Sequence, residues 1–86
     1  MENRIDFMKI RLFATLRDAA GQNKIEVDVA EPVTAGALKV MIVEQYPELL
    51  ETMDIAVFAV NKMFADLDTL VQPTDEVALF PPVSGG

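Results

Sequence analysis

The stretch IEVDVAEPVTAGALKVMIVEQY, residues 25–46, contains two hydrophobic periods and therefore decides the class of the fold. In residues 25–29 apolar residues alternate with acidic ones, which is the period of a half-buried strand. Pro32 breaks this strand, and Thr34 is a plausible cap for a following helix. In residues 38–46 the apolar spacing becomes i, i+3, i+4, i+7 and i+8, which predicts a helix with one buried face.

The sequence on both sides of this stretch predicts further strands. Residues 8–14 alternate, with Lys9 and Arg11 on the face opposite the apolar set. Residues 55–60, IAVFAV, suit a strand buried on both faces, and residues 76–80 form a last strand. The resulting order β-β-α-β-turn-β predicts an α+β fold, in which one helix packs across one sheet. The connecting segments are predicted as a loop or hairpin at 17–24, a connector with up to one more helical turn at 47–54, and turns at 61–62 and 73–75.

Composition excludes several classes of function. The chain has 86 residues, which fits one domain, and it contains neither Cys nor His, so disulfides, zinc-thiolate sites and Cys- or His-based catalysis are ruled out. The formal charge of -7 disfavours nucleic acid as a partner. No stretch resembles a signal peptide or a membrane span, so we expect a cytoplasmic protein with no membrane partner. Asp66, Asp68 and Asp75 lack the spacing of a calcium loop, so no metal is assigned.

The last six residues carry the chemistry. We expect a loose leader at 1–7, a domain at 8–80 and a flexible Gly-Gly tail at 81–86. Two prolines end the last strand and stiffen the exit, while the following Ser and Gly residues are small enough to enter a narrow channel. An ionised α-carboxylate is a poor acyl electrophile, so it must be activated before it reacts, most simply as an acyl-adenylate.

Three segments together resemble a known family. Residues 75–86, DEVALFPPVSGG, resemble the C-terminus of the small, sulfur-carrying subunits of molybdopterin synthase. Residues 12–17, with Leu-Phe-Ala followed by Leu-Arg, and residues 59–62, Ala-Val-Asn-Lys, resemble the first strand and the strand-and-turn segment of that family. The resemblance extends over residues 8–86 and implies the β-grasp, or ubiquitin-like, fold: a mixed sheet of four to five strands with one main helix packed across it.

The resemblance also implies a function. An adenylating enzyme similar to ubiquitin-activating enzymes would use ATP to form an acyl-adenylate on Gly86, and a sulfurtransferase system would convert it to a thiocarboxylate. The tail, with Gly85 beside the reacting residue, would then enter the large synthase subunit in a heterotetramer and donate sulfur to a pyranopterin precursor. On this interpretation the chain is a non-catalytic subunit in molybdenum cofactor biosynthesis that binds no cofactor itself.

Several residues are candidates for contact with the partner. Phe13 and Phe80 are predicted on the outer faces of their strands, where aromatic residues can anchor a partner. Phe64 is either a third anchor or a core residue, and Arg17 either pairs with a partner carboxylate or is a solvated cation. The tail segment completes the predicted contact set with Pro81, Pro82, Val83 and Ser84.

Three other functions remain open at this point. A sulfur carrier for thiamine thiazole synthesis and a ubiquitin-like modifier would share the fold and the Gly-Gly end. An interaction module with an inert tail belongs to another class and predicts that removal of Gly85-Gly86 changes nothing. Residues 80–84, FPPVS, favour the molybdopterin interpretation.

Overall fold

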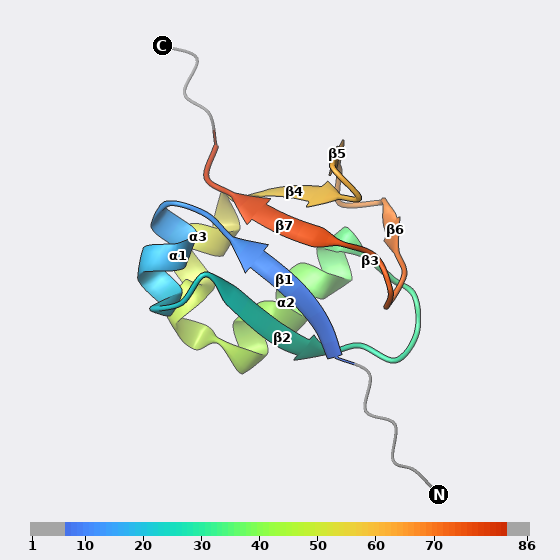
Figure 1. The fold of residues 1–86 in the computed structure, drawn as a ribbon, viewed down its shortest axis with the longest axis horizontal. Helices are drawn as coiled ribbons and strands as arrows, with labels where there is room; N and C mark the ends of the chain where they lie inside the picture. The colour runs from blue at the N-terminus through green and yellow to red at the C-terminus, as the bar shows by residue number, and fades with distance from the viewer. Residues whose placement is uncertain (1–6, 83–86) are drawn as a thin grey trace, which may run out of the picture.

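The computed structural model describes residues 7–82, in which one mixed sheet packs against helices (Figure 1). The five-stranded sheet has the order β2-β1-β7-β4-β5, with β1 parallel to β7 and every other neighbouring pair antiparallel. A second sheet of two strands pairs β3 with β6. The elements are β1 (Phe7–Leu12), α1 (Thr15–Ala20), β2 (Lys24–Asp28), β3 (Val33–Thr34), α2 (Ala35–Gln45), the 3₁₀ helix η1 (Pro47–Leu49), α3 (Leu50–Asp54), β4 (Val57–Val60), β5 (Met63–Ala65), β6 (Leu70–Val71) and β7 (Val77–Phe80).

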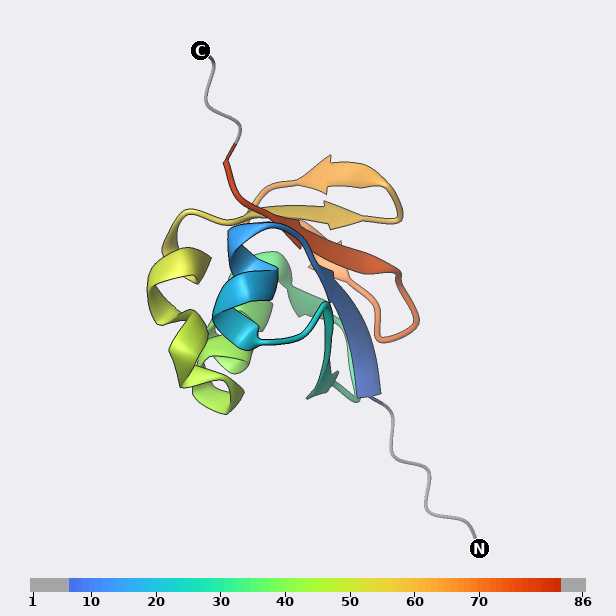
Figure 2. The same ribbon diagram turned by 60° about the vertical axis from the view of Figure 1, so that its left-hand side comes forward.

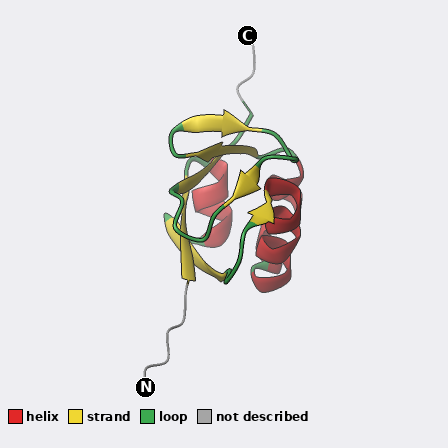
Figure 3. Ribbon diagram, turned by 90° about the vertical axis from the view of Figure 1, so that its right-hand side faces the viewer, coloured by secondary structure: helices red, strands yellow, loops and turns green. Residues whose placement is uncertain are grey.

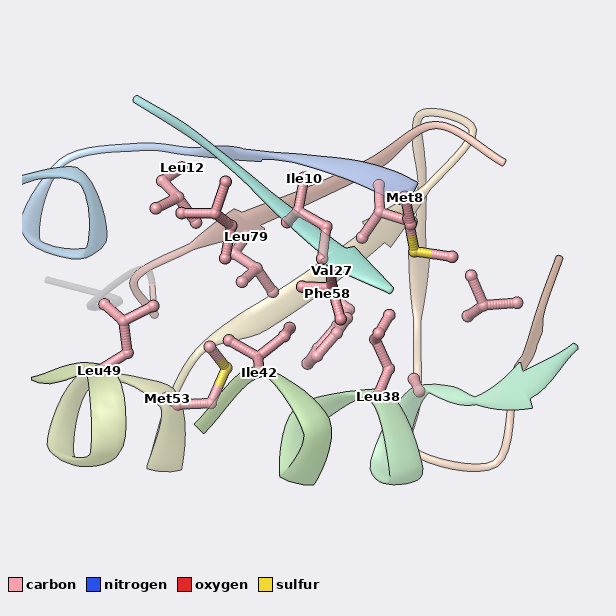
Figure 4. Close-up of a cluster of buried hydrophobic side chains, with 14 of the residues drawn as sticks. Met8, Ile10, Leu12, Val27, Leu38, Ile42, Leu49, Met53, Phe58 and Leu79 are labelled. Atoms are coloured by element: carbon pink, nitrogen blue, oxygen red, sulfur yellow. The ribbon is translucent and has the colours of Figure 1, made fainter. Parts of the chain in front are cut away.

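The core lies between the sheet and the helices. Figure 4 shows side chains from the inner face of the sheet meeting those of α2 and α3. Alternate residues of β1, β2 and β7 point into this layer, whereas α2 contributes one face of its turns. Figure 3 shows these layers from the side. The arrangement confirms the predicted α+β class, the mixed sheet and the main helix across it. The largest fully buried side chains include those of Met8, Ile10, Leu12, Leu38, Ile42, Leu49, Met53 and Leu79.

The first backbone amides of α2, which have no partner within the helix, donate hydrogen bonds to neighbouring parts of the domain. The Thr34 hydroxyl accepts a hydrogen bond from the Ala37 amide at 3.1 Å, which confirms the predicted cap. The loop before β6 supplies two carbonyls, because the Ala35 amide donates to Thr69 O at 2.8 Å and the Gly36 amide to Leu67 O at 2.9 Å. A Cβ on Gly36 would lie 3.3 Å from Leu67 O, so glycine permits this close approach.

The structure corrects the predicted start of the chain's first strand and the segment after it. Phe7 pairs with Asp28, so β1 begins one residue inside the predicted leader. The predicted loop at 17–24 is in part the short helix α1, which Gly21 ends at a φ of 76°. Such a short helix spans too few turns to show a hydrophobic period, so the sequence pattern did not reveal it.

Other differences concern short elements. Residues 47–54, predicted as a connector with up to one more helical turn, are helical throughout and form η1 and α3. The apolar run at 55–60 becomes a strand only from Val57, because α3 extends to Asp54. The strands β3, β5 and β6 have two or three residues each, which is too short for an alternation to be recognised. Within residues 7–82 no helix is long and apolar enough to cross a membrane.

Two loops far apart in the sequence are joined by Asn61. Asn61 and Lys62 have φ values of 53° and 70°, as in the two-residue turns that favour Asn at the first position. The Asn61 side chain donates to Asp75 Oδ1 at 3.1 Å and accepts from the Glu76 amide at 2.9 Å. Asp75 in turn accepts from the Gln72 amide at 2.8 Å. The predicted turns at 61–62 and 73–75 are confirmed, and the side-chain hydrogen bonds of Asn61 hold them next to each other.

We expect Asn61→Ala to lower the free energy of unfolding by about 2 kcal/mol, because it removes two side-chain hydrogen bonds and replaces asparagine, which tolerates a positive φ, with alanine, which tolerates it less well. Asn61→Gly is the matched control, since it removes the same hydrogen bonds but tolerates the backbone angle, and should cost about 1 kcal/mol. Chemical denaturation of both variants measures the difference. Equal losses would show that the backbone angle contributes nothing.

Candidate functional site

Figure 1 shows β1 beside β7 where the chain leaves the sheet, and this parallel pairing brings two aromatic side chains together. The Phe13 amide donates to Leu79 O at 3.2 Å, which holds the end of β1 against β7. The rings of Phe13 and Phe80 are stacked, with centroids 4.7 Å apart and planes inclined by 3°. The predicted placement of both rings on the outer side, away from the core set, is confirmed.

These two rings belong to a larger apolar surface around the root of the tail. It forms a hollow of about 570 Å³, whose lining we call the tail-root patch: Phe13, Ala14, Val57, Phe64, Phe80, Pro81 and Pro82. Phe64 is 79% exposed, so of its two interpretations the core residue is wrong. It is exposed because it lies on the edge strand β5 opposite Ala59, on the outer face of the sheet. The structure therefore brings together five of the predicted contact residues in one surface.

Ala14 joins the aromatic pair to α1 and was not predicted as part of the site. Its φ of 53° and ψ of -121° are unusual for a residue with a Cβ. Ala14 lies within a tight turn, which is closed by a hydrogen bond of 3.2 Å from the Leu16 amide to Phe13 O. Such a conformation costs about 1–3 kcal/mol and persists where surrounding contacts hold it. No sequence signal reveals this strain, because alanine is not a typical residue for a positive φ.

A second, smaller hollow of about 170 Å³ continues the patch across the outer face of the sheet. Its floor contains Ala59 and Ala78, which are directly opposite each other in β4 and β7. Arg11, Lys62 and Glu76 flank this floor, so two cations and one carboxylate leave it with an excess of positive charge in a chain that is acidic as a whole. Alternation along residues 8–14 predicts Arg11 on the outer face, but only the strand register shows which residues lie beside it.

Arg17 lies apart from the tail-root patch. It is part of α1, and its Nε lies 3.7 Å from Asp18 Oδ1, with both side chains largely exposed. It lines a separate hollow with Gly21 and neighbouring polar residues. An exposed pair of this kind contributes little to stability. A role for Arg17 in partner binding stays a prediction.

The remaining predicted site residues, Val83, Ser84, Gly85 and Gly86, lie outside the described residues. Elsewhere, in residues 7–82, no three acidic side chains gather closely enough to hold a metal ion. The tail-root patch presents aromatic rings and rigid prolines, and the adjoining hollow adds two cations and one carboxylate.

Comparisons with known proteins agree with this geometry. The ThiS family model matches residues 10–86. A molybdopterin synthase sulfur carrier subunit from Dictyostelium discoideum is 33% identical over 81 residues, which cover 91% of this chain and 94% of that protein. Small archaeal modifier protein 1 from Haloferax volcanii is 36% identical over 87 residues, covering 92% of this chain and all of that protein. A crystal structure of the same H. volcanii modifier has a TM-score of 0.78 and 32% identity, and covers 90% of this chain and 98% of that chain.

The family match begins within β1 and covers the rest of the chain, including every residue of the tail-root patch and the Gly-Gly end. The solved relative shares the ubiquitin-like β-grasp arrangement of a mixed sheet with a helix across it. The chain therefore belongs to the ThiS family.

Proposed function

We propose that this chain is the sulfur carrier subunit of molybdopterin synthase. The observation that carries the proposal is its similarity, over nearly its full length, to proteins of that name from Dictyostelium, Arabidopsis and human. A carrier of this kind needs no catalytic side chain of its own, which suits a sequence without Cys or His. On this proposal the chain acts in the cytoplasm as the non-catalytic subunit of a transferase complex.

The reacting group in the proposal is the α-carboxylate of Gly86. The carboxylate oxygen attacks the α-phosphorus of ATP on an adenylating enzyme, and pyrophosphate leaves. A sulfide equivalent from a sulfurtransferase system then displaces AMP from the acyl carbon, which leaves a thiocarboxylate. Within the large subunit this sulfur is donated to the pyranopterin precursor of molybdenum cofactor. Gly85 and Gly86 suit this route because they have no side chain to obstruct a narrow channel.

The tail-root patch supplies the docking surface in the same proposal. The domain, which begins with β1 at Phe7, presents Phe13, Phe64 and Phe80 to the large subunit, and residues 81–86 act as the tail. Stacked, half-exposed rings lose little side-chain entropy on binding, so they suit an interface that must form and dissociate in each cycle. The two prolines hold the direction in which the chain leaves the patch.

A protein modifier is the second candidate, favoured by the 36% identity to small archaeal modifier protein 1. A modifier would use the same acyl-adenylate but transfer Gly86 to a lysine amine, which forms an amide bond and releases AMP. The two functions therefore differ in the acceptor, sulfur or amine, and not in the activation step. The thiazole carrier differs from the first candidate only in its partner, a thiazole synthase.

Intact mass spectrometry tests the reacting group. We expect that incubation with the host's adenylating enzyme, ATP and a sulfur source adds a mass equal to replacement of one oxygen by one sulfur, localised to Gly86. A chain lacking Gly85-Gly86 is the matched control and should not react. If the full chain also fails to react while another carrier reacts in the same mixture, the proposal is wrong and the inert-tail module is favoured. Gly86–lysine amide adducts without sulfur transfer would identify the modifier.

Substitution of Phe80 tests the docking surface. We expect Phe80→Ala to raise the Kd for the large synthase subunit about thirtyfold, or about 2 kcal/mol, because it removes one ring of the stack at the tail root. Phe7→Ala is the matched control: Phe7 is an exposed phenylalanine at the far end of β1 and lines neither hollow of the site. Titration calorimetry measures both, with thermal unfolding as a check on the fold. Equal Kd values for the two variants would contradict the assignment of the patch.

A further inference from the structure

Helix α2 carries apolar residues all round, although the domain covers only one side of it. Leu38 and Ile42 are buried against the sheet, whereas Val40, on another side of the helix, is 58% exposed. A helix that is apolar on all sides is ordinarily buried on all sides. The outer side of α2 therefore has the composition of a covered surface, but residues 7–82 leave it open.

A hollow of about 550 Å³ lies on this outer side, between α2 and α3. Figure 2 shows the helices gathered along one side of the sheet. Val40, Val43, Leu50 and Met53 supply its apolar lining, and Leu50 is 62% exposed at its edge. We call this surface the helix hollow; none of its lining residues belongs to the tail-root patch.

The rim of the helix hollow is acidic. Glu44, Glu51 and Asp54 line it, and among residues 7–82 none of these carboxylates has an ion-pair partner within 4.0 Å. Lys39 is the lining cation, and its Nζ donates to the backbone carbonyl of Asp54 at 3.2 Å. Glu44 lies in the last turn of α2, where a negative charge opposes the helix dipole. Its position is therefore unfavourable for the isolated helix, and a cation that approaches from outside would offset this cost.

We propose that the helix hollow binds an amphipathic helix of a partner protein, in which Lys or Arg residues flank the apolar side chains. The charge of the rim selects a basic partner. The walls are helices with their backbone groups bonded internally, so the hollow offers no edge for an added strand, and side chains of a helix are the suitable ligand. A second copy of this chain is disfavoured, because it would bring its own acidic rim against this one.

This surface is independent of the sulfur carrier proposal. Because the two surfaces share no lining residue, a partner on the helix hollow leaves Phe13, Phe64 and Phe80 accessible. The chain could thus hold a basic protein on its helical side while the tail root is engaged. Loss of either proposal leaves the other untouched.

Titration of the full chain with a synthetic peptide, followed by amide NMR shifts, tests the inference. The probe is a peptide of about 18 residues with leucines along one helical face and lysines on the other, long enough to be helical when bound. We expect the amide shifts of residues 39–44 and 50–54 to change saturably with peptide concentration. The Kd obtained from these changes should rise as the salt concentration is raised. The matched peptide with glutamate in place of lysine should not bind.

Two pairs of variants locate the binding. Leu50→Gln should raise the Kd at least about tenfold, whereas Leu70→Gln, at an equally exposed leucine that lines neither hollow, should leave it within about twofold. Glu51→Lys should weaken binding more than Glu31→Lys, since both reverse one exposed charge but only Glu51 lines the hollow.

Four results would overturn the inference: no saturable shift, shifts centred on the tail-root patch, equal effects within either pair of variants, or equal binding of the glutamate peptide. Sedimentation of the chain alone gives a further test. Self-association that Leu50→Gln abolishes would identify a second copy as the occupant and would also overturn it.

Discussion

The parallel pairing of β1 with β7 is the contact on which the rest of the structure depends. Ile10 is opposite Val77 and Leu12 is opposite Leu79, so the first and last strands bury their apolar residues in the same core. Bringing such distant segments together costs loop-closure entropy, which rises only slowly with length and is offset by this burial. With β7 held between β1 and β4, the chain must leave the sheet beside the end of β1. The pairing thus builds both the core and the tail root.

The two sides of the sheet are used for different purposes. The inner side is closed by α2, η1 and α3 and contains the core (Figure 4). The outer side carries small residues at Ala59 and Ala78, with Arg11 and Lys62 beside them, and ends in the aromatic patch. Acidic groups lie on both sides of the domain, with Glu44, Glu51 and Asp54 around the hollow between α2 and α3, and Glu26, Asp28 and Glu76 on the sheet side. A chain with a formal charge of -7 can therefore still present cations next to the surface proposed to meet its synthase partner.

Periodicity along the chain was sufficient for the longer elements. Alternation predicted β1 and β2, and the Thr34 cap and the apolar spacing predicted α2, because each of these patterns repeats several times within its element. The short strands β3, β5 and β6 could not be predicted in this way, since each has only two or three residues, and the hydrogen bonds of β3 and β6 also come from a distant partner. Helix α1 was missed for a similar reason. Phe64 could not be placed either, because its exposure depends on β5 being an edge strand.

The sequence by itself determined which chemistry this protein can and cannot perform. The absence of Cys and His, the small residues at 84–86 and the two hydrophobic periods are properties of the covalent chain and hold in any fold. The tertiary structure alone decided which of these residues meet. Strand order and register place Phe13 on Phe80 and add Phe64 to the same patch. They also form the second, smaller hollow over Ala59 and Ala78. Register is set by burial of one face of the whole sheet, which no single segment contains.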